Sequence, residues 1–510
     1  MSDPNDPNRP AAPGRKIPSG LRWSADNGGR SQPDAMEASL EEDTEQSPSP
    51  ARAAAVQMPA PGTAPRRPPV PVQGVPSGPP PSSQRPATPA PVAAAPGFVP
   101  REPRSWEEVG YDRAVVEDLV LRILLNRSVA TGRELAAECC LPMGFIKDVV
   151  ESLKTQKLVI HRSASAVGDF QSELSGDGRT RANEAKEKTT YVGPAPVPWA
   201  QYLVSVKAQA LTHLTPTPAD LAQAFGDLSV SEELLDRLGP AVTSCRPMFL
   251  HGDPGNGKTS LAERMTKCFG DLIWVPHTLD IDGQLVKFFD KAVHVPMEPS
   301  SNIERLDRRW IRIKRPTVIA GGELTLEMLE LKLDEYSNLC EPPIQLKANC
   351  GTLVIDDFGR GNLAPKDLLN RWIVPLEKRI DFLRLPDGRK IEVPFECLLV
   401  FSTNLEPKDL VDEAFMRRIP YKIHVYDPSE DDFRALVELL ARKMDIQLPP
   451  RSVQYLIDRH YKMNKRSFRF CHPRDLLLQI KHMCAYEERP PVAGTHEWDR
   501  VVKNYFGMLS

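Results

Sequence analysis

The sequence predicts an α/β fold in which helices cover a parallel β-sheet and an all-helical segment follows. Three observations support this prediction. Apolar strands alternate with amphipathic helices between residues 201 and 426, a glycine-rich loop joins one strand to a helix at 252–257, and only helical periodicity follows Val425. Alternating strands and helices are typical of βαβ units, whose strands run parallel.

The first 104 residues differ in composition from the rest of the chain. Of the 51 prolines among 510 residues, 24 lie in this segment. Proline donates no backbone N–H, and a segment with few large apolar side chains cannot offset the entropy lost on ordering. We therefore expect residues 1–104 to form a disordered Pro/Ala-rich tail.

Residues 105–175 predict a small domain of three helices and two strands. The first helix, 112–126, places five apolar side chains on one face: Val116, Leu119, Val120, Ile123 and Leu124. A capping box at 131–134 begins the second helix, the third spans about 143–157, and strands are expected at 158–162 and 169–174. Three helices closed by a two-stranded wing resemble a winged helix-turn-helix domain.

The charge of this region bears on whether it reads DNA. Residues 106–192 contain 12 Lys and Arg against 14 Asp and Glu. Without a basic surface, contact with protein or a structural role is favoured over binding of nucleic acid. Residues 176–200, rich in Gly, Thr, Lys, Glu and Pro, are expected to form a linker.

Composition also bears on the environment of the protein. The net charge of −3 excludes a uniformly basic, nucleic-acid-coating protein. Apolar runs such as 119–125 are shorter than the roughly 20 residues that span a bilayer, and the N-terminus has no apolar signal core. We expect a cytoplasmic protein with no membrane partner.

The nine cysteines show no C-x-x-C spacing, so a disulfide framework is not expected. The nearest approach to a metal motif is Cys471, His472, His482 and Cys484. The order of these residues fits no standard zinc pattern, which favours a structural interpretation.

Residues 252–260 form the phosphate-binding loop motif G-x-x-x-x-G-K-[ST]. An apolar strand at 247–251 precedes the motif and a helix follows it. The glycines allow successive backbone N–H groups to face one anion, Lys258 would contact the β/γ-phosphates, and the Thr259 hydroxyl would bind Mg²⁺. The candidate nucleotide-binding residues are Gly252, Asp253, Pro254, Gly255, Asn256, Gly257, Lys258, Thr259 and Ser260.

A second motif is the apolar strand 352–355, which ends in two carboxylates. This is the form of a Walker B motif. Asp356 would hold Mg²⁺ together with Thr259, and Asp357 would orient the attacking water.

With these motifs the segment 205–510 resembles the AAA+ ATPases, and further family landmarks follow in order. Asn404, after the strand 397–403, resembles sensor 1. Arg418, or its neighbour Arg417, resembles the arginine finger, and Arg474 resembles sensor 2. The resemblance implies that Asp357, Asn404, Arg418 and Arg474 are the catalytic residues.

The resemblance also implies a division into an α/β ATPase core, 201–426, and a helical lid, 427–510. Residues 381–394 read as two strands around a Pro-Asp-Gly turn. Such a hairpin before sensor 1 resembles the branch that contains the MoxR-type chaperones and magnesium-chelatase subunits.

Two features depart from the family pattern. Most family members have Glu where Asp357 stands, so slow hydrolysis is one expectation. In addition, 98 positions separate Lys258 from Asp356, which indicates an insert between about 277 and 346. Within it, residues 304–316 carry six basic side chains. This segment is either an exposed amphipathic strand or a loop that contacts a substrate or nucleic acid.

The function implied is hydrolysis of ATP, with Mg²⁺, coupled to remodelling of a protein partner. The resemblance further implies a ring-shaped homo-oligomer, expected to be a hexamer. Two alternatives stay open: a DNA-associated regulator that uses the winged helix, and a nucleotide-binding scaffold that turns over slowly.

Overall fold

The computed structural model describes residues 98–507 apart from 167–168, 271 and 299–304. Most of the predicted tail therefore lies outside the described residues. Its last part, 98–104, differs from the prediction, because Pro100 accepts a backbone hydrogen bond from Asp307 and the ring of Phe98 lies 5.1 Å from that of Trp310. Burial of an aromatic ring against a second one orders this short segment.

The first described region combines helices with a small antiparallel sheet. In chain order it contains α1 (Trp106–Val109), α2 (Arg113–Arg127), β1 (Val129–Thr131), α3 (Gly132–Cys139), α4 (Met143–Thr155), β2 (Val159–Ala166) and β3 (Asp169–Leu174). The strand order is β1-β3-β2. The three predicted helices and two predicted strands are confirmed, as is the capping box of Thr131 and Glu134. Strand β1 was not predicted.

The linker prediction for 176–200 is wrong over its first half. Residues Gly176–Lys188 form helix α5, whose N-terminus is capped by the Ser175 hydroxyl. This helix packs on α2, where Arg122 donates a hydrogen bond to the carbonyl of Ala185. Helix α2 is therefore covered on more than the one face that its sequence pattern indicates. The contact of α5 uses small residues, Ala182 and Ala185, which carry almost no hydrophobic signal.

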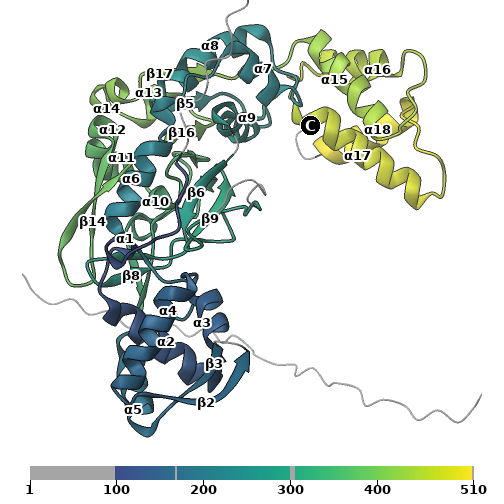
Figure 1. The fold of residues 1–510 in the computed structure, drawn as a ribbon. Helices are drawn as coiled ribbons and strands as arrows, with labels where there is room; N and C mark the ends of the chain where they lie inside the picture. The colour runs from purple at the N-terminus through teal and green to yellow at the C-terminus, as the bar shows by residue number, and fades with distance from the viewer. Residues whose placement is uncertain (1–97, 167–168, 271, 299–304, 508–510) are drawn as a thin grey trace, which may run out of the picture. The chain divides into compact units, whose positions relative to one another are not determined.

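The central sheet is parallel throughout and has the order β10-β13-β16-β5-β17. Of its strands, Figure 1 labels β5, β16 and β17. Its strands are β10 (Thr317–Ala320), β13 (Thr352–Ile355), β16 (Leu398–Thr403), β5 (Met248–His251) and β17 (Tyr421–His424). This arrangement confirms the predicted α/β fold class, with the P-loop strand β5 between β16 and β17.

Both faces of this sheet are covered by helices. One face packs against α7 (Pro218–Phe225), α8 (Glu232–Ser244) and α9 (Lys258–Met265) through side chains such as Leu250 and Val400. The other face packs against α11 (Pro365–Arg371), α12 (Ile373–Lys378) and α14 (Glu413–Arg418), and it includes Phe249 and Phe401. Successive residues of β5 therefore contribute to opposite cores, as the two-residue repeat of a strand requires.

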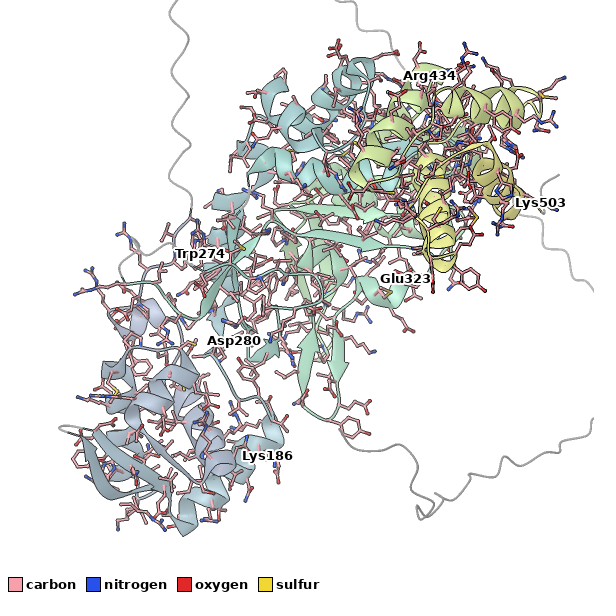
Figure 2. All side chains as sticks on the ribbon, turned by 90° about the vertical axis from the view of Figure 1, so that its right-hand side faces the viewer. Lys186, Trp274, Asp280, Glu323, Arg434 and Lys503 are labelled. Atoms are coloured by element: carbon pink, nitrogen blue, oxygen red, sulfur yellow. The ribbon has the colours of Figure 1, made fainter. Side chains whose placement is uncertain are left out.

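The predicted insert is interrupted, because β10 within it belongs to the central sheet. The residues on either side of β10 form smaller sheets. One pairs β6 (Leu272–Pro276) with β9 (Trp310–Lys314), and Trp274, labelled in Figure 2, lies on β6. The other has the order β11-β12-β8-β7-β4, made of Lys332–Asp334, Leu339–Glu341, Gln284–Val286, Leu279–Ile281 and Val197–Pro198.

The described part of the basic segment, 305–316, is neither a free loop nor a fully exposed strand. Arg309 is only 1% exposed, forms an ion pair of 2.8 Å with Asp307, and donates a hydrogen bond to the carbonyl of Val109. Trp310 and Ile313 are buried in the core beneath β9. A guanidinium that is buried and paired in this way is not available to a substrate or to nucleic acid.

Three short helices complete the core: α6 (Trp199–Gln209), α10 (Ile344–Lys347) and α13 (Pro407–Leu410), together with the 3₁₀ turns η1 (Leu211–His213), η2 (Thr266–Phe269) and η3 (Leu326–Leu329). The predicted hairpin is confirmed. Strands β14 (Ile380–Arg384) and β15 (Lys390–Pro394) pair antiparallel on either side of the Pro-Asp-Gly turn.

The C-terminal segment is helical, as predicted. It contains α15 (Glu430–Lys443), α16 (Ser452–Tyr455), the π-helical segment η4 (Leu456–Lys462), α17 (Cys471–Tyr486) and α18 (Thr495–Phe506). In Figure 2, Arg434 marks α15 and Lys503 marks α18. Its core is formed by Phe433, Val437, Leu456, Tyr461, Leu477 and Trp498. No helix in the described part of the chain is long and apolar enough to cross a membrane.

Candidate functional site

The P-loop connects the carboxyl end of β5 to the N-terminus of α9 (Figure 1). Two of its glycines are required by close packing. A Cβ on Gly252 would lie 2.4 Å from the carbonyl oxygen of Val425, and one on Gly255 would lie 2.5 Å from Sγ of Cys471. Both residues also have positive φ, at 141° and 85°. The local backbone therefore depends on glycine at these positions.

Lys258 is the most constrained side chain of the loop. Its Nζ donates to the carbonyls of Gly252 and Asp253, each at 3.0 Å, and to Oδ1 of Asn404 at 2.5 Å. All three ammonium protons are thus used. The residue is 7% exposed, and burial lowers its pKa while Asp356 and Asp357 act in the opposite direction.

The two acidic residues after β13 lie beside this lysine. Asp356 accepts a hydrogen bond of 2.6 Å from the Thr259 hydroxyl, which joins the two predicted Mg²⁺ ligands. Asp357 accepts a weaker one, 3.3 Å, from Nδ2 of Asn404. Asn404 therefore bridges Lys258 and Asp357. The structure brings together Lys258, Thr259, Asp356, Asp357 and Asn404, which lie at three separate places in the sequence, up to 146 positions apart.

A cavity of about 610 Å³ adjoins these residues. The P-loop residues from Pro254 to Ser260 line it, together with Asp356, Asp357, Asn404 and Arg474. Gly252 and Asp253 do not line it and contribute their carbonyls to Lys258 instead. Apolar side chains form another part of the wall: Leu228, Val230, Leu234, Tyr426, Leu436 and Leu440. Volume and lining are in the range of small-molecule sites, with a polar end and an apolar end.

Arg474 lines this cavity, yet its side chain is 62% exposed and is paired with its neighbour Asp475 at 3.0 Å. A different lid residue reaches the P-loop. Arg469 forms an ion pair of 2.9 Å with Asp253 and a second one with Asp427. The sequence analysis missed Arg469, and the motif that singles out Arg474 carries no signal for it.

Two backbone and side-chain contacts reinforce this connection between lid and loop. The N–H of Cys471 donates to the carbonyl of Gly255 at 3.0 Å. Asn256, only 3% exposed, donates to Oδ1 of Asp427 at 2.7 Å. The P-loop is therefore held by Arg469, Cys471 and Asp427 from the segment beyond β17.

Arg418 and Arg417 do not reach the P-loop of their own chain. Arg418 is paired with Glu377 at 2.6 Å, and Arg417 with Glu413 at 2.9 Å. Both line a second cavity, of about 590 Å³, together with Arg246 and Arg379. Residues that directly precede β5 and β16 also line it, so it lies at the amino ends of these strands, opposite to the P-loop.

Two further groups of residues have local partners: the acidic residue Glu323, and the cysteines and histidines at 471–484. Glu323, labelled in Figure 2, lies in the turn after β10, and its carboxylate accepts a hydrogen bond from the Gly321 N–H at 2.9 Å. His472 is buried, with Nδ1 3.1 Å from the Tyr461 hydroxyl, and Sγ of Cys471 lies 3.9 Å from the Tyr505 hydroxyl. Within the described residues, Cys471, His472, His482 and Cys484 form no metal-ligand cluster.

Comparison with known proteins adds one sequence family and several structures. A family described as a domain of unknown function, DUF8689, matches residues 429–504, within the helical segment from α15 to α18. No curated protein matches the sequence.

Among solved structures, RuvB of Thermotoga maritima, described as a Holliday junction branch migration motor, is similar at 13% identity. The similarity covers 54% of this chain and 69% of that one, with a TM-score of 0.31. NtrX from Brucella abortus is similar at 11% identity over 63% of this chain and 60% of that one, with a TM-score of 0.35. The fold assignment rests on the strand order and the P-loop position rather than on these scores.

Proposed function

We propose that this chain binds ATP with Mg²⁺ and hydrolyses it, in the manner of the AAA+ ATPases that it resembles. The observation that carries this proposal is the contact chain from Lys258 through Asn404 to Asp357, beside the Thr259–Asp356 pair, in one cavity. A phosphate-binding lysine, an oxygen pair suited to Mg²⁺ and a separate carboxylate are the parts that phosphoryl transfer to water requires.

The residues that line the cavity fit both Mg²⁺ and a nucleotide. Thr259 and Asp356 offer a hydroxyl and a carboxylate oxygen, the ligand type that Mg²⁺ prefers. The apolar wall around Leu234, Tyr426 and Leu440 offers a surface for the base of a nucleotide. Bound Mg²⁺ would neutralise charge on the phosphates, and Lys258 would add a second positive charge beside it.

Asp357 is the residue proposed to orient and deprotonate water. It is free of the Thr259 hydrogen bond that occupies Asp356, and the one side-chain hydrogen bond described for it is the long one from Asn404. The carboxylate of Asp is one methylene shorter than that of Glu, so slow turnover is consistent with the proposal. In the limit of very slow turnover, the chain would act as the nucleotide-binding scaffold considered above.

Arg418 is proposed to serve a neighbouring subunit, with Arg417 as the alternative. Its own P-loop lies at the opposite end of the sheet, so it can contact a phosphate only on another chain. This supports a ring-shaped homo-oligomer, which we propose to be a hexamer. An arginine supplied in this way stabilises charge in the transition state.

The output of the cycle is proposed to be remodelling of a protein partner. The region of α2, α3, α4 and β1–β3, which we interpret as a winged helix, is the candidate contact surface. On α4 the exposed side chains Lys147 and Lys154 alternate with Asp148 and Glu151. This mixed charge favours a protein surface over a DNA backbone, so the DNA-associated regulator stays the second choice.

Two single substitutions test the ATPase proposal. Lys258→Ala should abolish ATP binding, because the remaining loop N–H groups do not neutralise a triphosphate. Asp357→Asn should keep ATP bound while lowering kcat on the order of 10²-fold or more, because the group that takes the proton is lost. Titration of a fluorescent ATP analogue and steady-state phosphate release measure the two effects separately.

The two variants serve as controls for each other, since both change one charged side chain in the same cavity. Unchanged ATP affinity of Lys258→Ala would contradict the nucleotide site. Normal turnover of Asp357→Asn would show that another group, with Glu323 or Asp356 the first to examine, is the base.

A further inference from the structure

Two histidines and a glutamate meet at the carboxyl edge of the central sheet, next to the P-loop. His251 is the last residue of β5 and directly precedes Gly252. His424 is the last residue of β17 and is paired with His251 in the parallel register. Glu406 follows β16, the neighbour of β5 on the other side, and lies two residues after Asn404. Three adjacent parallel strands thus bring these side chains to one place.

The distances between these groups are close to those of a metal site. Nδ1 of His251 lies 3.7 Å from Oε1 of Glu406, and the two imidazole rings are 4.9 Å apart at 75°. One ligand atom from each of the three residues lies within 4.8 Å of the others. Zinc binds such atoms at about 2.0–2.2 Å, so tetrahedral ligands are separated by about 3.3–3.6 Å. The 3.7 Å between Nδ1 of His251 and Oε1 of Glu406 is already close to this spacing.

The second observation is that Nδ1 of each histidine has no hydrogen-bond partner. His251 is 9% exposed, and its Nδ1, which faces Glu406, is buried and unpaired; Nδ1 of His424 is also buried and unpaired. A buried polar atom without a partner is unfavourable for the folded state. A cation bound between the three side chains would give the nitrogens a partner.

The local chemistry suits a metal that prefers neutral imidazole. Burial lowers the pKa of His251, and the nearby charges of His424 and Arg237 act in the same direction, against Glu406. A lower pKa favours the neutral imidazole, which is the form that binds metal. Arg237 itself lies over the ring of Tyr426, 5.8 Å from its centroid, and not between the ligands.

We propose that His251, His424 and Glu406 bind one divalent transition-metal ion, with Zn²⁺ the best match. Two imidazoles and one carboxylate leave the fourth tetrahedral position open to water or another ligand. In the described part of the chain this is the one group of three such residues within ligand distance. The site is distinct from the Thr259–Asp356 pair, whose oxygen donors suit Mg²⁺.

The position of the site would allow a bound metal to affect the nucleotide cavity. His251 precedes the glycine whose carbonyl accepts from Lys258, and Glu406 closely follows Asn404. A metal joining His251 to Glu406 would fix the spacing between the P-loop and the Asn404 loop. It would therefore act on the cavity without touching a phosphate.

The proposal is tested with the full chain, free of purification tags and of metal, titrated with Co²⁺ and then with Zn²⁺. Co²⁺ should bind with one equivalent at this site, produce the visible absorption of tetrahedral nitrogen and oxygen coordination, and be displaced by Zn²⁺. His424→Ala and Glu406→Ala should weaken binding by more than the 10–100-fold that loss of an outer partner of a ligand causes. His213→Ala, at an exposed position in η1, is the matched control and should bind as the wild type does.

A second readout guards against misfolding of a variant. Zn²⁺ should raise the thermal midpoint of the wild type and of His213→Ala but not that of His424→Ala, compared with each protein without metal. Equal Co²⁺ affinity in wild type and His424→Ala would overturn the proposal. So would near-ultraviolet thiolate charge-transfer absorption, because it would place the metal on cysteine. If His424→Ala is unfolded without metal, Glu406→Gln decides the question by the same two measurements.

Discussion

At the scale of single residues, Asn404 shows how one side chain serves two partners in the cavity. Its amide oxygen accepts from Lys258 and its amide nitrogen donates to Asp357. An aspartate at this position could accept but not donate, and an aliphatic residue could do neither. The requirement for both a donor and an acceptor explains why an amide stands between a cation and an anion here.

His472 yields a prediction about pH. Burial, together with the charges of Arg469 and Arg466, lowers its pKa to about 4 from the ordinary value near 6.5. The unfolded chain therefore takes up a proton below pH 6.5 that the folded chain takes up only near pH 4. The free energy of unfolding of the lid should be highest above pH 6.5 and fall by roughly 1–3 kcal/mol between pH 6.5 and 4.

The measurement is the urea concentration at which α17 loses protection from hydrogen exchange, followed across this pH range. His472→Gln should show a smaller decrease than the wild type. His482→Gln, an exposed position on the same helix, is the matched control and should retain the full decrease. Parallel profiles for wild type and His472→Gln would contradict the assignment of this acid sensitivity to His472.

At the scale of elements, the start of α17 is attached to the P-loop through Arg469 and Cys471. Arg469→Ala removes the ion pairs with Asp253 and Asp427. Because partly exposed ion pairs contribute about 0.2–1 kcal/mol each, the backbone N–H of Cys471, bonded to Gly255, should exchange roughly 2–10-fold faster. Hydrogen exchange of peptides covering 468–476 measures this.

Arg474→Ala is the control for this prediction. The two arginines lie five residues apart, but Arg474 is paired only with the adjacent Asp475 in its described ion pairs. Its loss should leave exchange at Cys471 unchanged. Equal acceleration of exchange in both variants would indicate a general loosening of the helix. Unchanged exchange in Arg469→Ala would contradict the proposed attachment of α17 to the P-loop.

Elements with a strong local signal were predictable from the sequence, and those defined by distant contacts were not. The hairpin β14–β15 has a Pro-Asp-Gly turn between alternating strands, and the four segments of the lid have clear helical periodicity. Helix α5 was missed because it packs through Ala182 and Ala185, whose burial gives little hydrophobic contrast. The prediction places strand β10 in an insert, because a strand of four residues has no sequence feature that indicates which sheet it joins.

The residues of the candidate site also divide into those with a local sequence signal and those defined by distant contacts. Lys258, Thr259, Asp356, Asp357 and Asn404 lie in short motifs at strand ends, and the parallel sheet brings such ends together. Arg469 lies in no motif, and its role depends on the fold of the lid against Asp253 and Asp427. His251 and His424 become neighbours only through the register of β5 and β17.

At the scale of the whole molecule, Arg418 leads to a prediction about assembly. Its side chain lies at the opposite end of the sheet from its own P-loop. Arg418→Ala should therefore retain ATP binding but lose turnover by roughly 10³–10⁵-fold. When Arg418→Ala is mixed with Lys258→Ala, some hydrolysis should return, because an intact arginine can then face an intact P-loop on another subunit. The recovery of hydrolysis is measured as phosphate release over a range of mixing ratios.

Exchange of subunits must be demonstrated in the same samples, for example by energy transfer between labelled chains. A mixture that stays inactive despite exchange contradicts an arginine acting between subunits. Normal hydrolysis by Arg418→Ala does so as well. Arg417→Ala, which changes the exposed neighbour paired with Glu413, is then examined in the same mixture.

The strand order of the central sheet also has a consequence for how the protein is made. Strand β5 pairs on one side with β16, where Met248 faces Val400, and on the other with β17, where it faces Tyr421. These partners are synthesised about 150 residues or more after β5, which takes roughly 8–30 s at 5–20 residues per second. Both edges of the apolar strand that carries the P-loop lack their partners for that time. The phosphate-binding segment, early in the core's sequence, is therefore among the last to gain its final neighbours on the ribosome.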